Sequence, residues 1–250
     1  MVMQRRPQPR PNDALYPSTA KDIVSWMEPP NRVDDVYLEL PRSILLARGV
    51  VVWLGAVAMA GSAVCAWLTV IALMDSELMI AVIGLAATFV GLALGVYMIR
   101  QDLEPPKDEP IRFNRLRRKV YVYRFYTRWN PFSREGWGVR PVAYDWDDVR
   151  VELVSNYAPT VAYASSYQMY VVKPGTEEEI DRFTFCVGEN GAYYWEWARN
   201  FMQQGPQALP KFDCPPRDWN NEDPGINIAR WFAPKVQWPH DMDIESRTAP

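Results

Sequence analysis

Two stretches of the chain carry no charged side chain, residues 49–74 and residues 78–99, and only Asp75-Ser76-Glu77 separates them. A helix rises about 1.5 Å per residue, so about 20 apolar residues cross the roughly 30 Å hydrocarbon core of a bilayer. Both stretches reach that length. The pattern therefore predicts a transmembrane helical hairpin over residues 44–100, with spans at about 49–74 and 78–99.

The hydrophobic period changes after a polar, proline-rich spacer at residues 104–110. Short alternating runs rich in β-branched and aromatic residues then predict antiparallel strands, and a turn at residues 115–119 joins the first two. After the strands, apolar positions at helical spacing predict a helix over residues 192–203, which Gly205-Pro206 ends. The predicted strands are residues 111–114, 120–125, 142–146, 149–154, 161–164, 167–173 and 180–187.

These elements predict an α+β protein, in which a two-helix transmembrane hairpin is followed by an antiparallel β-rich domain with one C-terminal helix. The strands would form a partly open barrel of pleckstrin-homology-like type, and the helix would cover one opening. We expect four parts: a Pro-rich N-terminal cytosolic segment at 1–43, the hairpin at 44–100, the β-rich domain at 110–205, and a Pro/Trp-rich irregular tail at 206–250.

The two ends of this division carry weaker patterns. Within residues 1–43, two short amphipathic pieces at 21–27 and 33–40 are expected to pack on another part of the protein, and the opening dozen residues are expected to be disordered. The tail contains Trp219, Trp231 and Trp238. Amphipathic rings of this kind are expected on the domain or at the membrane surface.

Charge along the chain predicts the topology. Cytoplasmic flanks of membrane spans carry an excess of Lys and Arg, and the loop between the two spans has neither. Both termini are therefore expected in the cytoplasm. Residues 1–10 are basic but no apolar run follows them, so the first span would act as an uncleaved anchor. The basic flanking residues are Arg42, Arg48, Arg100, Lys107, Arg112, Arg115, Arg117, Arg118 and Lys119.

Small residues in the two spans suggest how the helices pack, because small side chains let two backbones approach closely. Packing within one hairpin is the favoured interpretation, with a dimer contact and no role as alternatives. The spans contain no ionisable group of the kind that an ion or proton pathway needs, which argues against a transporter or channel. The candidate packing residues are Gly84, Gly91 and Gly95 in the second span and Ala56, Ala60 and Ala63 in the first.

Composition excludes several kinds of chemistry. A net charge of −3 argues against a nucleic-acid partner. With a single histidine, His240, no imidazole metal site is expected. The scattered Cys65, Cys186 and Cys214 predict free thiols and no disulfide framework.

A basic cluster follows the second span and consists of Arg112, Arg115, Arg117, Arg118 and Lys119. It is a candidate contact for anionic lipids or a protein partner, because each such charge near an anionic surface contributes about 1 kcal/mol. The alternatives are a solvated turn and, more weakly, RNA binding.

Asp145, Asp147 and Asp148 form the sharpest acidic group, and a turn with solvated acids is favoured over acid–base or metal chemistry. The chain has no Gly-rich phosphate loop and no Gly-x-Ser-x-Gly motif, and one histidine leaves little room for a Ser-His-Asp triad. We therefore predict no catalytic, metal-binding or cofactor-binding residues, no cofactor, and a protein that is not an enzyme.

Several motifs resemble an uncharacterised membrane-anchored domain family of proteobacteria, over about residues 20–215. They are PIRFNR at 110–115, RKVYVY at 118–123, WDDV at 146–149, WARNFM at 197–202, and the pairs at 205–206 and 209–210. The resemblance implies a transmembrane hairpin with a β-rich domain at the bacterial inner membrane. Members are often encoded near type VI secretion effectors, which implies an immunity or accessory role, and the family carries no established catalytic residues. A second likeness, to bacterial pleckstrin-homology-like membrane domains, rests on the order of elements.

Two functions remain in competition. In the first, the hairpin anchors an interaction domain that binds another protein, such as a secreted antibacterial effector. In the second, the domain is a lipid-sensing or scaffold module that uses the basic cluster against lipid headgroups. A membrane-tethered enzyme is the least favoured alternative.

Overall fold

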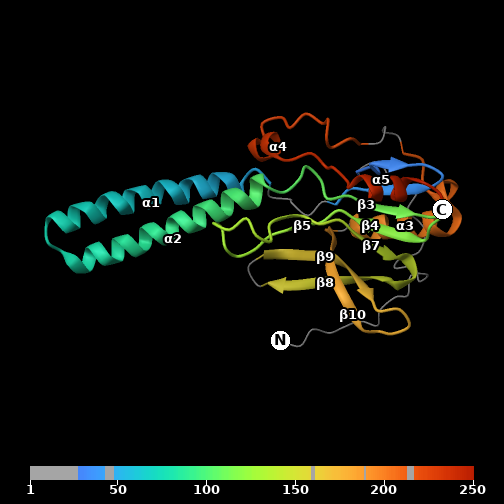
Figure 1. Ribbon diagram of the computed structural model, residues 1–250, viewed down its shortest axis with the longest axis horizontal. Coiled ribbons are helices and arrows are strands. Elements are labelled where there is room, and N and C mark those ends of the chain that lie inside the picture. The colour runs from blue at the N-terminus through green and yellow to red at the C-terminus, as the bar shows by residue number, and fades with distance from the viewer. Residues whose placement is uncertain (1–27, 43–47, 159–160, 189, 213–216) are drawn as a thin grey trace.

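The computed structural model describes residues 28–42, 48–158, 161–188, 190–212 and 217–250. Two long helices project from one end of a domain made of sheets, helices and a C-terminal segment that folds back over it (Figure 1). The opening dozen residues, the amphipathic piece at 21–27 and Cys214 lie outside the described residues.

The two projecting helices are α1, Val51–Met74, and α2, Leu78–Leu103, and together they are called the membrane hairpin. A tight turn joins them, in which Ser76 has a φ of 61° and the amide of Glu77 donates to the carbonyl of Ala72 at 2.8 Å. Both helices are long and apolar enough to cross a membrane. Most of their large apolar side chains point outward and are exposed, which in a water-soluble protein would be a large unfavourable surface.

The two helices pack through a row of small side chains. On α1 the buried positions are Gly55, Ser62, Thr69 and Ala72, of which the first three recur every seven residues. A seven-residue repeat keeps one side of a helix facing its partner. A Cβ atom on Gly95 would lie 2.5 Å from Cγ of Met59, so the backbones leave no room for a side chain there.

The predicted glycines of α2 lie in this contact. A Cβ atom on Gly91 would lie 3.1 Å from Cβ of Ser62, and one on Gly84 would lie 2.3 Å from Oγ1 of Thr69. The prediction for α1 is wrong in register, because Ala56, Ala60 and Ala63 are all exposed on the outward side. The buried row includes the hydroxyl residues Ser62 and Thr69, so the positions of the alanines do not identify it.

Replacing Gly95 by leucine is expected to destabilise the membrane hairpin by about 1–3 kcal/mol, because overpacking forces the neighbouring atoms apart. A Cβ there would meet both Met59 and the carbonyl oxygen of Gly55, the latter at 2.9 Å. Gly61→Leu is the matched control, since no atom lies within 4 Å of its Cβ position. Thermal unfolding of the purified protein in detergent measures the difference. Equal midpoints for the two variants would contradict this packing.

A five-stranded antiparallel sheet joins residues from both sides of the membrane hairpin, in the order β1-β2-β3-β4-β7. Leu40 at the end of β2 pairs with Ile111 at the start of β3, so the hairpin is an insertion between two neighbouring strands. The chain therefore leaves β2 and enters β3 at the same end of these two neighbouring strands. The strands are Arg32–Val33, Tyr37–Leu40, Ile111–Asn114, Lys119–Val122 and Val142–Asp145.

This pairing changes the predicted division of the chain. Residues 32–40 belong to the main sheet and are not part of a separate N-terminal segment. Sequence periodicity cannot detect a pairing between strands that lie about 70 residues apart, because each strand is short and its partner is set by tertiary structure.

A second, three-stranded sheet has the order β10-β9-β8, with β8 at Val149–Ala158, β9 at Val161–Val172 and β10 at Glu179–Val187. The 3₁₀ turn η3, Trp146–Asp148, connects β7 of the first sheet to β8 of the second. A small pair is formed by β5, Phe125–Tyr126, and β6, Gly138–Val139.

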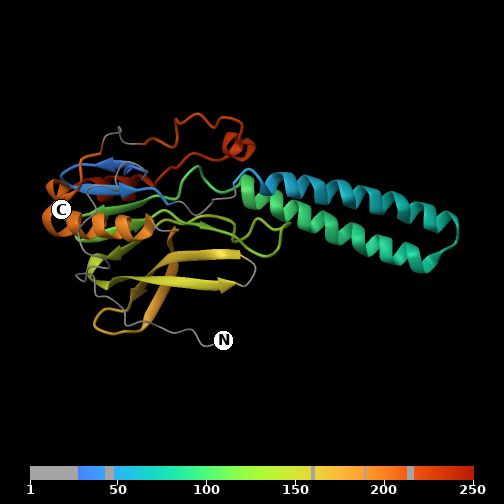
Figure 2. The same cartoon turned by 180° about the vertical axis from the view of Figure 1, so that it is seen from behind.

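Helix α3, Asn190–Gln204, closes the core at the end of the domain far from the membrane hairpin (Figure 2). Buried aromatic side chains from both sheets and α3 meet there, including Phe113, Trp146, Phe185, Trp195 and Phe201. The predicted α+β fold is confirmed: a helical hairpin is followed by antiparallel sheets and a helix, and the described strands form no closed barrel.

The last part of the chain is more ordered than the sequence predicts. It contains η4, Pro206–Ala208, then α4, Ile228–Phe232, and α5, His240–Arg247. Figure 1 shows α4 beside the base of the membrane hairpin and α5 against the first sheet. Of the three tryptophans of this segment, Trp238 packs on Tyr123 at 5.1 Å and Trp219 on Arg217 at 3.5 Å, whereas Trp231 is exposed.

Candidate functional site

The basic cluster does not form one exposed surface, because Arg112 is buried. On β3, Ile111 and Phe113 face the core, and Arg112 faces the opposite side, which α5 covers. The guanidinium of Arg112 forms ion pairs with Glu39 and, at 2.7 Å, with Asp243. It also donates to the hydroxyl of Ser246 at 2.8 Å and lies 4.4 Å from the Trp238 ring centre.

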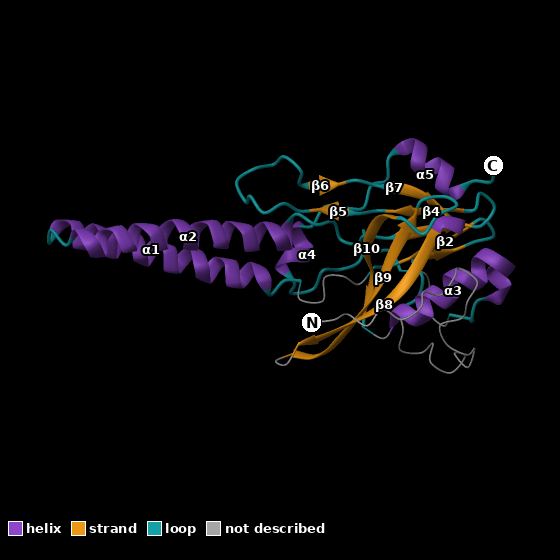
Figure 3. Ribbon diagram, turned by 90° about the horizontal axis from the view of Figure 1, so that it is seen from below, coloured by secondary structure: helices purple, strands orange, loops and turns teal. Residues whose placement is uncertain are grey.

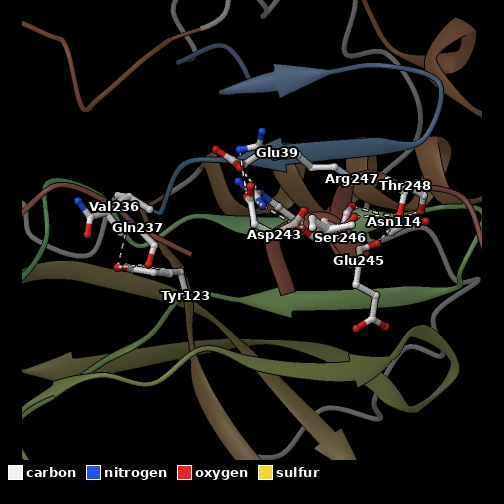
Figure 4. Close-up of polar contacts among 12 residues, drawn as sticks. Glu39, Asn114, Tyr123, Val236, Gln237, Asp243, Glu245, Ser246, Arg247 and Thr248 are labelled. Carbon is white, nitrogen blue, oxygen red and sulfur yellow. Dashed lines mark hydrogen bonds and ion pairs between the residues drawn. The ribbon is translucent and has the colours of Figure 1, made fainter. Parts of the chain in front are cut away.

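The other members of the basic cluster also bind this protein's own groups. Arg117 donates to the carbonyl of Ala249 at 2.6 Å, and Lys119 pairs with Glu245 at 2.8 Å. Beside them, Nδ2 of Asn114 donates to the carbonyls of Ser246 at 3.1 Å and Thr248 at 3.0 Å (Figure 4). Arg118 pairs with Asp147 at 2.5 Å, and Arg115 donates weakly to the carbonyl of Asp35 at 3.4 Å. Arg112, Arg117 and Lys119 therefore hold the C-terminal segment against the sheet.

The position of the cluster also bears on the lipid hypothesis. Arg117 contacts Ala249, and the C-terminus lies at the end of the domain opposite the membrane hairpin (Figure 1). The turn at residues 115–118 is thus far from any bilayer that α1 and α2 cross. Sequence distance from the second span suggested closeness to lipid, but β3 runs away from the hairpin.

A polar hollow of about 720 Å³ lies between the first sheet and the C-terminal segment. Its walls include the aromatic rings of Tyr37, Trp219 and Trp238, and side chains of both charges line it. Such a mixture suits a charged or zwitterionic group of a partner, because opposite charges and ring faces are available together. The cations are Arg32, Arg112, Arg217 and Arg247, and the anions are Glu39, Asp108, Asp218 and Asp243.

The cations of the polar hollow differ in their freedom. Arg217 is held by Glu28 at 2.6 Å and Glu222 at 2.9 Å. The side chain of Arg32 is 59% exposed and lies 3.6 Å from Asp34, and that of Arg247 is 45% exposed. Exposed ion pairs of this kind contribute little to stability. Arg32 and Arg247 are therefore the cations that a partner can reach with least cost to the fold.

Asp108 lies at the inner edge of the polar hollow and is buried, with 6% of its surface exposed. Its carboxylate accepts hydrogen bonds from Nδ2 of Asn31 at 2.9 Å, from the amide of Arg42 at 3.1 Å and from the amide of Glu109 at 2.8 Å. Burial raises the pKa of Asp108 to about 7, since loss of water penalises the charged form more than these donors favour it.

We expect the Asp108→Asn variant to lose part of the pH dependence of stability. The unfolded chain releases this proton near pH 3.8 and the folded chain near pH 7, so the unfolded state holds fewer protons between these values. This group therefore lowers stability as pH rises through that window, and its effect is constant above it. Denaturation at about pH 5 and about pH 8 measures the effect. An unchanged pH slope in the variant, with exposed Asp147→Asn as control, would contradict the assignment.

No catalytic arrangement emerges from the other candidate residues. Asp145 and Asp147 are exposed, as expected for a turn with solvated acids. Cys65 and Cys186 are free thiols, and burial raises the pKa of Cys186 to about 12, which keeps it protonated and a poor nucleophile. Within the described ranges, no group of three or more His, Cys, Asp or Glu side chains is arranged to hold a metal ion.

The base of the membrane hairpin contains structural contacts that the sequence does not reveal. Asp102, buried near the end of α2, accepts hydrogen bonds from the amides of Gly49 and Val52, each at 2.9 Å. It therefore supplies from α2 the N-terminal cap that α1 lacks locally. Arg48 donates to the carbonyls of Pro105 and Pro106, and Nδ2 of Asn227 donates to the carbonyl of Arg48 at 2.9 Å. These contacts join the base of the hairpin to the domain.

A family model described as a family of unknown function, DUF6708, matches residues 88–224. The match covers more than half of the chain and runs from near the middle of α2 through α3 into the C-terminal segment. The chain therefore belongs to this family. Neither the curated proteins nor the solved structures gave a match.

Proposed function

We propose that this DUF6708 protein is an integral inner-membrane protein that holds a binding domain at the cytoplasmic face of the bilayer. The outward apolar surface of α1 and α2 supports membrane insertion, because lipid replaces the water that this surface would otherwise meet. The insertion of the hairpin between paired strands β2 and β3 supports an even number of crossings.

The orientation rests on charge. Arg48 and Arg100 lie at the domain end of the hairpin, whereas the turn carries Asp75 and Glu77. The domain and both termini are then cytoplasmic. A C-terminal fusion to an enzyme that works only in the periplasm is expected to be inactive, and an active fusion would reverse the orientation.

The function that we propose is recognition of a protein partner. The polar hollow carries this proposal, because Trp, Tyr and Arg are the residues that most often dominate binding energy at interfaces, and they concentrate there. Recognition by surface complementarity needs no catalytic group, in keeping with the role of an interaction protein and not an enzyme.

The partner that we propose is a secreted antibacterial effector, with this protein acting as an immunity or accessory factor of type VI secretion. The resemblance of the motifs at residues 110–123, 146–149 and 197–202 to a family often encoded beside such effectors supports this choice. An anchor at the inner membrane would place the domain where an incoming effector first reaches the cytoplasm.

Deletion of the gene in a strain that carries the neighbouring effector tests this role. The deletion strain is expected to lose competitions against toxin-positive siblings, and the wild-type gene restores survival. Arg32→Glu should fail to restore it, because it reverses an accessible charge of the polar hollow. Arg118→Glu, at the far end of the domain, should restore it. Full fitness of the deletion strain would reject immunity.

A further inference from the structure

Exposed apolar side chains of the domain gather beside the base of the membrane hairpin. Outside α1, α2 and the adjoining Val50, five large apolar side chains of the described residues are at least 65% exposed, and no other exceeds 55%. They come from two segments, the loop between β5 and β6 and the segment around α4. The five are Trp129, Phe132, Ile226, Trp231 and Phe232.

The β5–β6 loop is fastened to α2. The Trp129 ring lies 5.9 Å from the Tyr97 ring, and the guanidinium of Arg100 lies 4.3 Å from the centre of the Trp137 ring. Arg100 also donates to the carbonyl of Ser133 at 2.9 Å. The loop is therefore held along the last turns of the helix, with Trp129 and Phe132 pointing away from the domain core.

The segment around α4 is fastened to the other side of the base. Asn227 caps α4 by accepting from the amide of Arg230 at 3.2 Å, and its Nδ2 donates to the carbonyl of Arg48. The indole of Trp231 donates to the carbonyl of Gly225 at 2.7 Å, which orders the turn that carries Ile226. Figure 1 shows α4 above and the β5–β6 loop below the base of the helices, and Figure 3 shows that both lie at the hairpin end of the domain.

The length of α2 places the β5–β6 loop at the surface of a bilayer that the helices cross. Twenty-six residues of α2 extend about 39 Å, roughly 9 Å more than the hydrocarbon core needs. The excess equals about six residues. If the turn between the helices lies at the far edge of the hydrocarbon core, α2 therefore leaves the hydrocarbon core near Tyr97. Tyr97 is the residue against which Trp129 packs. Amphipathic aromatic rings are enriched at this depth.

We propose that Trp129 and Phe132 on one side, and Ile226, Trp231 and Phe232 on the other, insert into the interfacial layer of the membrane that α1 and α2 cross. This inference rests on the proposed membrane insertion of the hairpin. Continuity with the helices identifies the occupant as lipid, because a side chain packed on Tyr97 meets whatever solvates α2 at that depth. Exposed Arg128, Arg134 and Lys235 lie in the same two segments, accompanied by Glu135 and Asp223.

Two contacts on opposite sides of the base would fix the orientation of the domain. A two-helix stem alone permits the domain to tilt, whereas apolar contacts on both sides resist tilting in either direction. The polar hollow would then be presented at a constant height above the bilayer.

Site-specific fluorescence quenching tests the proposal on the full chain. Single cysteines replace Phe132, Ile226, Leu116 or Val64 in a background in which Cys65, Cys186 and Cys214 are substituted, and each carries an environment-sensitive fluorophore. The protein is reconstituted into phosphatidylcholine and phosphatidylglycerol vesicles that contain lipids with a nitroxide quencher at a shallow or a deep acyl position. Leu116 is the distal control, and Val64 in α1 reports insertion of the hairpin.

The proposal predicts that shallow quenchers quench the probes at positions 132 and 226 several-fold more than the probe at 116, whereas deep quenchers act on position 64. If the probe at 64 is quenched but the probe at 132, the probe at 226 or both are not, the two-sided contact is overturned and the membrane anchor stands. No quenching at 64 would reject the anchor itself and the inference with it. Quenching by lipid also distinguishes the bilayer from a protein partner, which carries no quencher.

Discussion

Replacing Arg112 by methionine is expected to lower the free energy of unfolding by about 3 kcal/mol, because a buried cation is lost and the part-buried Glu39 is left without its ion pair. Asp243 keeps its second ion pair, with Arg247 at 3.0 Å. The side chain of Arg112 is only 4% exposed and neutralises both Glu39 and Asp243. Methionine retains the length of the side chain but not its charge or its bond to Ser246. Denaturant titration in detergent, followed by tryptophan fluorescence, measures the change.

Arg118→Met is the matched control, since it removes another arginine of the same basic cluster. Arg118 and Asp147 form an ion pair whose side chains are 47% and 75% exposed. An exposed pair of this kind contributes about 0–1 kcal/mol. Losses of equal size in the two variants would contradict the conclusion that the cluster is divided into a buried structural residue and solvated ones.

The second large effect is expected at Trp146. Its side chain is fully buried at the junction between the two sheets, with ring centres 5.2 Å from Trp195 and 6.0 Å from Phe113. Trp146→Ala removes a large apolar volume that the surrounding strands cannot refill, and such truncations cost about 3–5 kcal/mol.

Exposed Trp129 provides the control for this truncation. In detergent, Trp129→Ala is expected to change the free energy of unfolding by less than about 1 kcal/mol, because surface substitutions seldom cost more. The same denaturant titration compares both variants with the wild type. A small loss for Trp146→Ala would mean that the two sheets and α3 do not share one core.

Local pattern sufficed for the elements whose signals lie within a few residues. The uncharged stretches predicted α1 and α2, and the alternation on both sides of residues 115–119 predicted the β3–β4 hairpin. The apolar spacing from Tyr194 to Phe201, followed by Gly205-Pro206, predicted α3 and its end. In the structure Gly205 has a φ of 93°, which glycine adopts readily.

Contacts between distant segments could not be predicted in this way. Nothing in residues 32–40 reveals that they pair with β3 across the membrane hairpin. Arg112 is buried because α5, which lies about 130 residues further along the chain, packs over it. A count of basic residues gives the charge of a segment but not the carboxylates that neutralise it. The sequence therefore indicated the basic cluster as the candidate site, whereas the structure indicates the polar hollow and the base of the membrane hairpin.

The membrane topology of the protein follows from how the two long helices are solvated. In this account lipid surrounds α1 and α2, and Asp102, Arg48 and Asn227 couple them to the domain. The helices expose large apolar residues such as Trp53, Trp67 and Phe89 along most of their length. Beyond its base, the hairpin projects away from the described domain, so the domain does not cover the apolar side chains of the projecting part (Figure 1).

Extraction of isolated membranes with alkaline sodium carbonate tests this account most directly. Carbonate releases peripheral proteins and leaves integral proteins in the bilayer. The full chain is expected to remain in the membrane pellet and to dissolve only when detergent is added. Recovery of the intact chain in the carbonate supernatant would contradict the account.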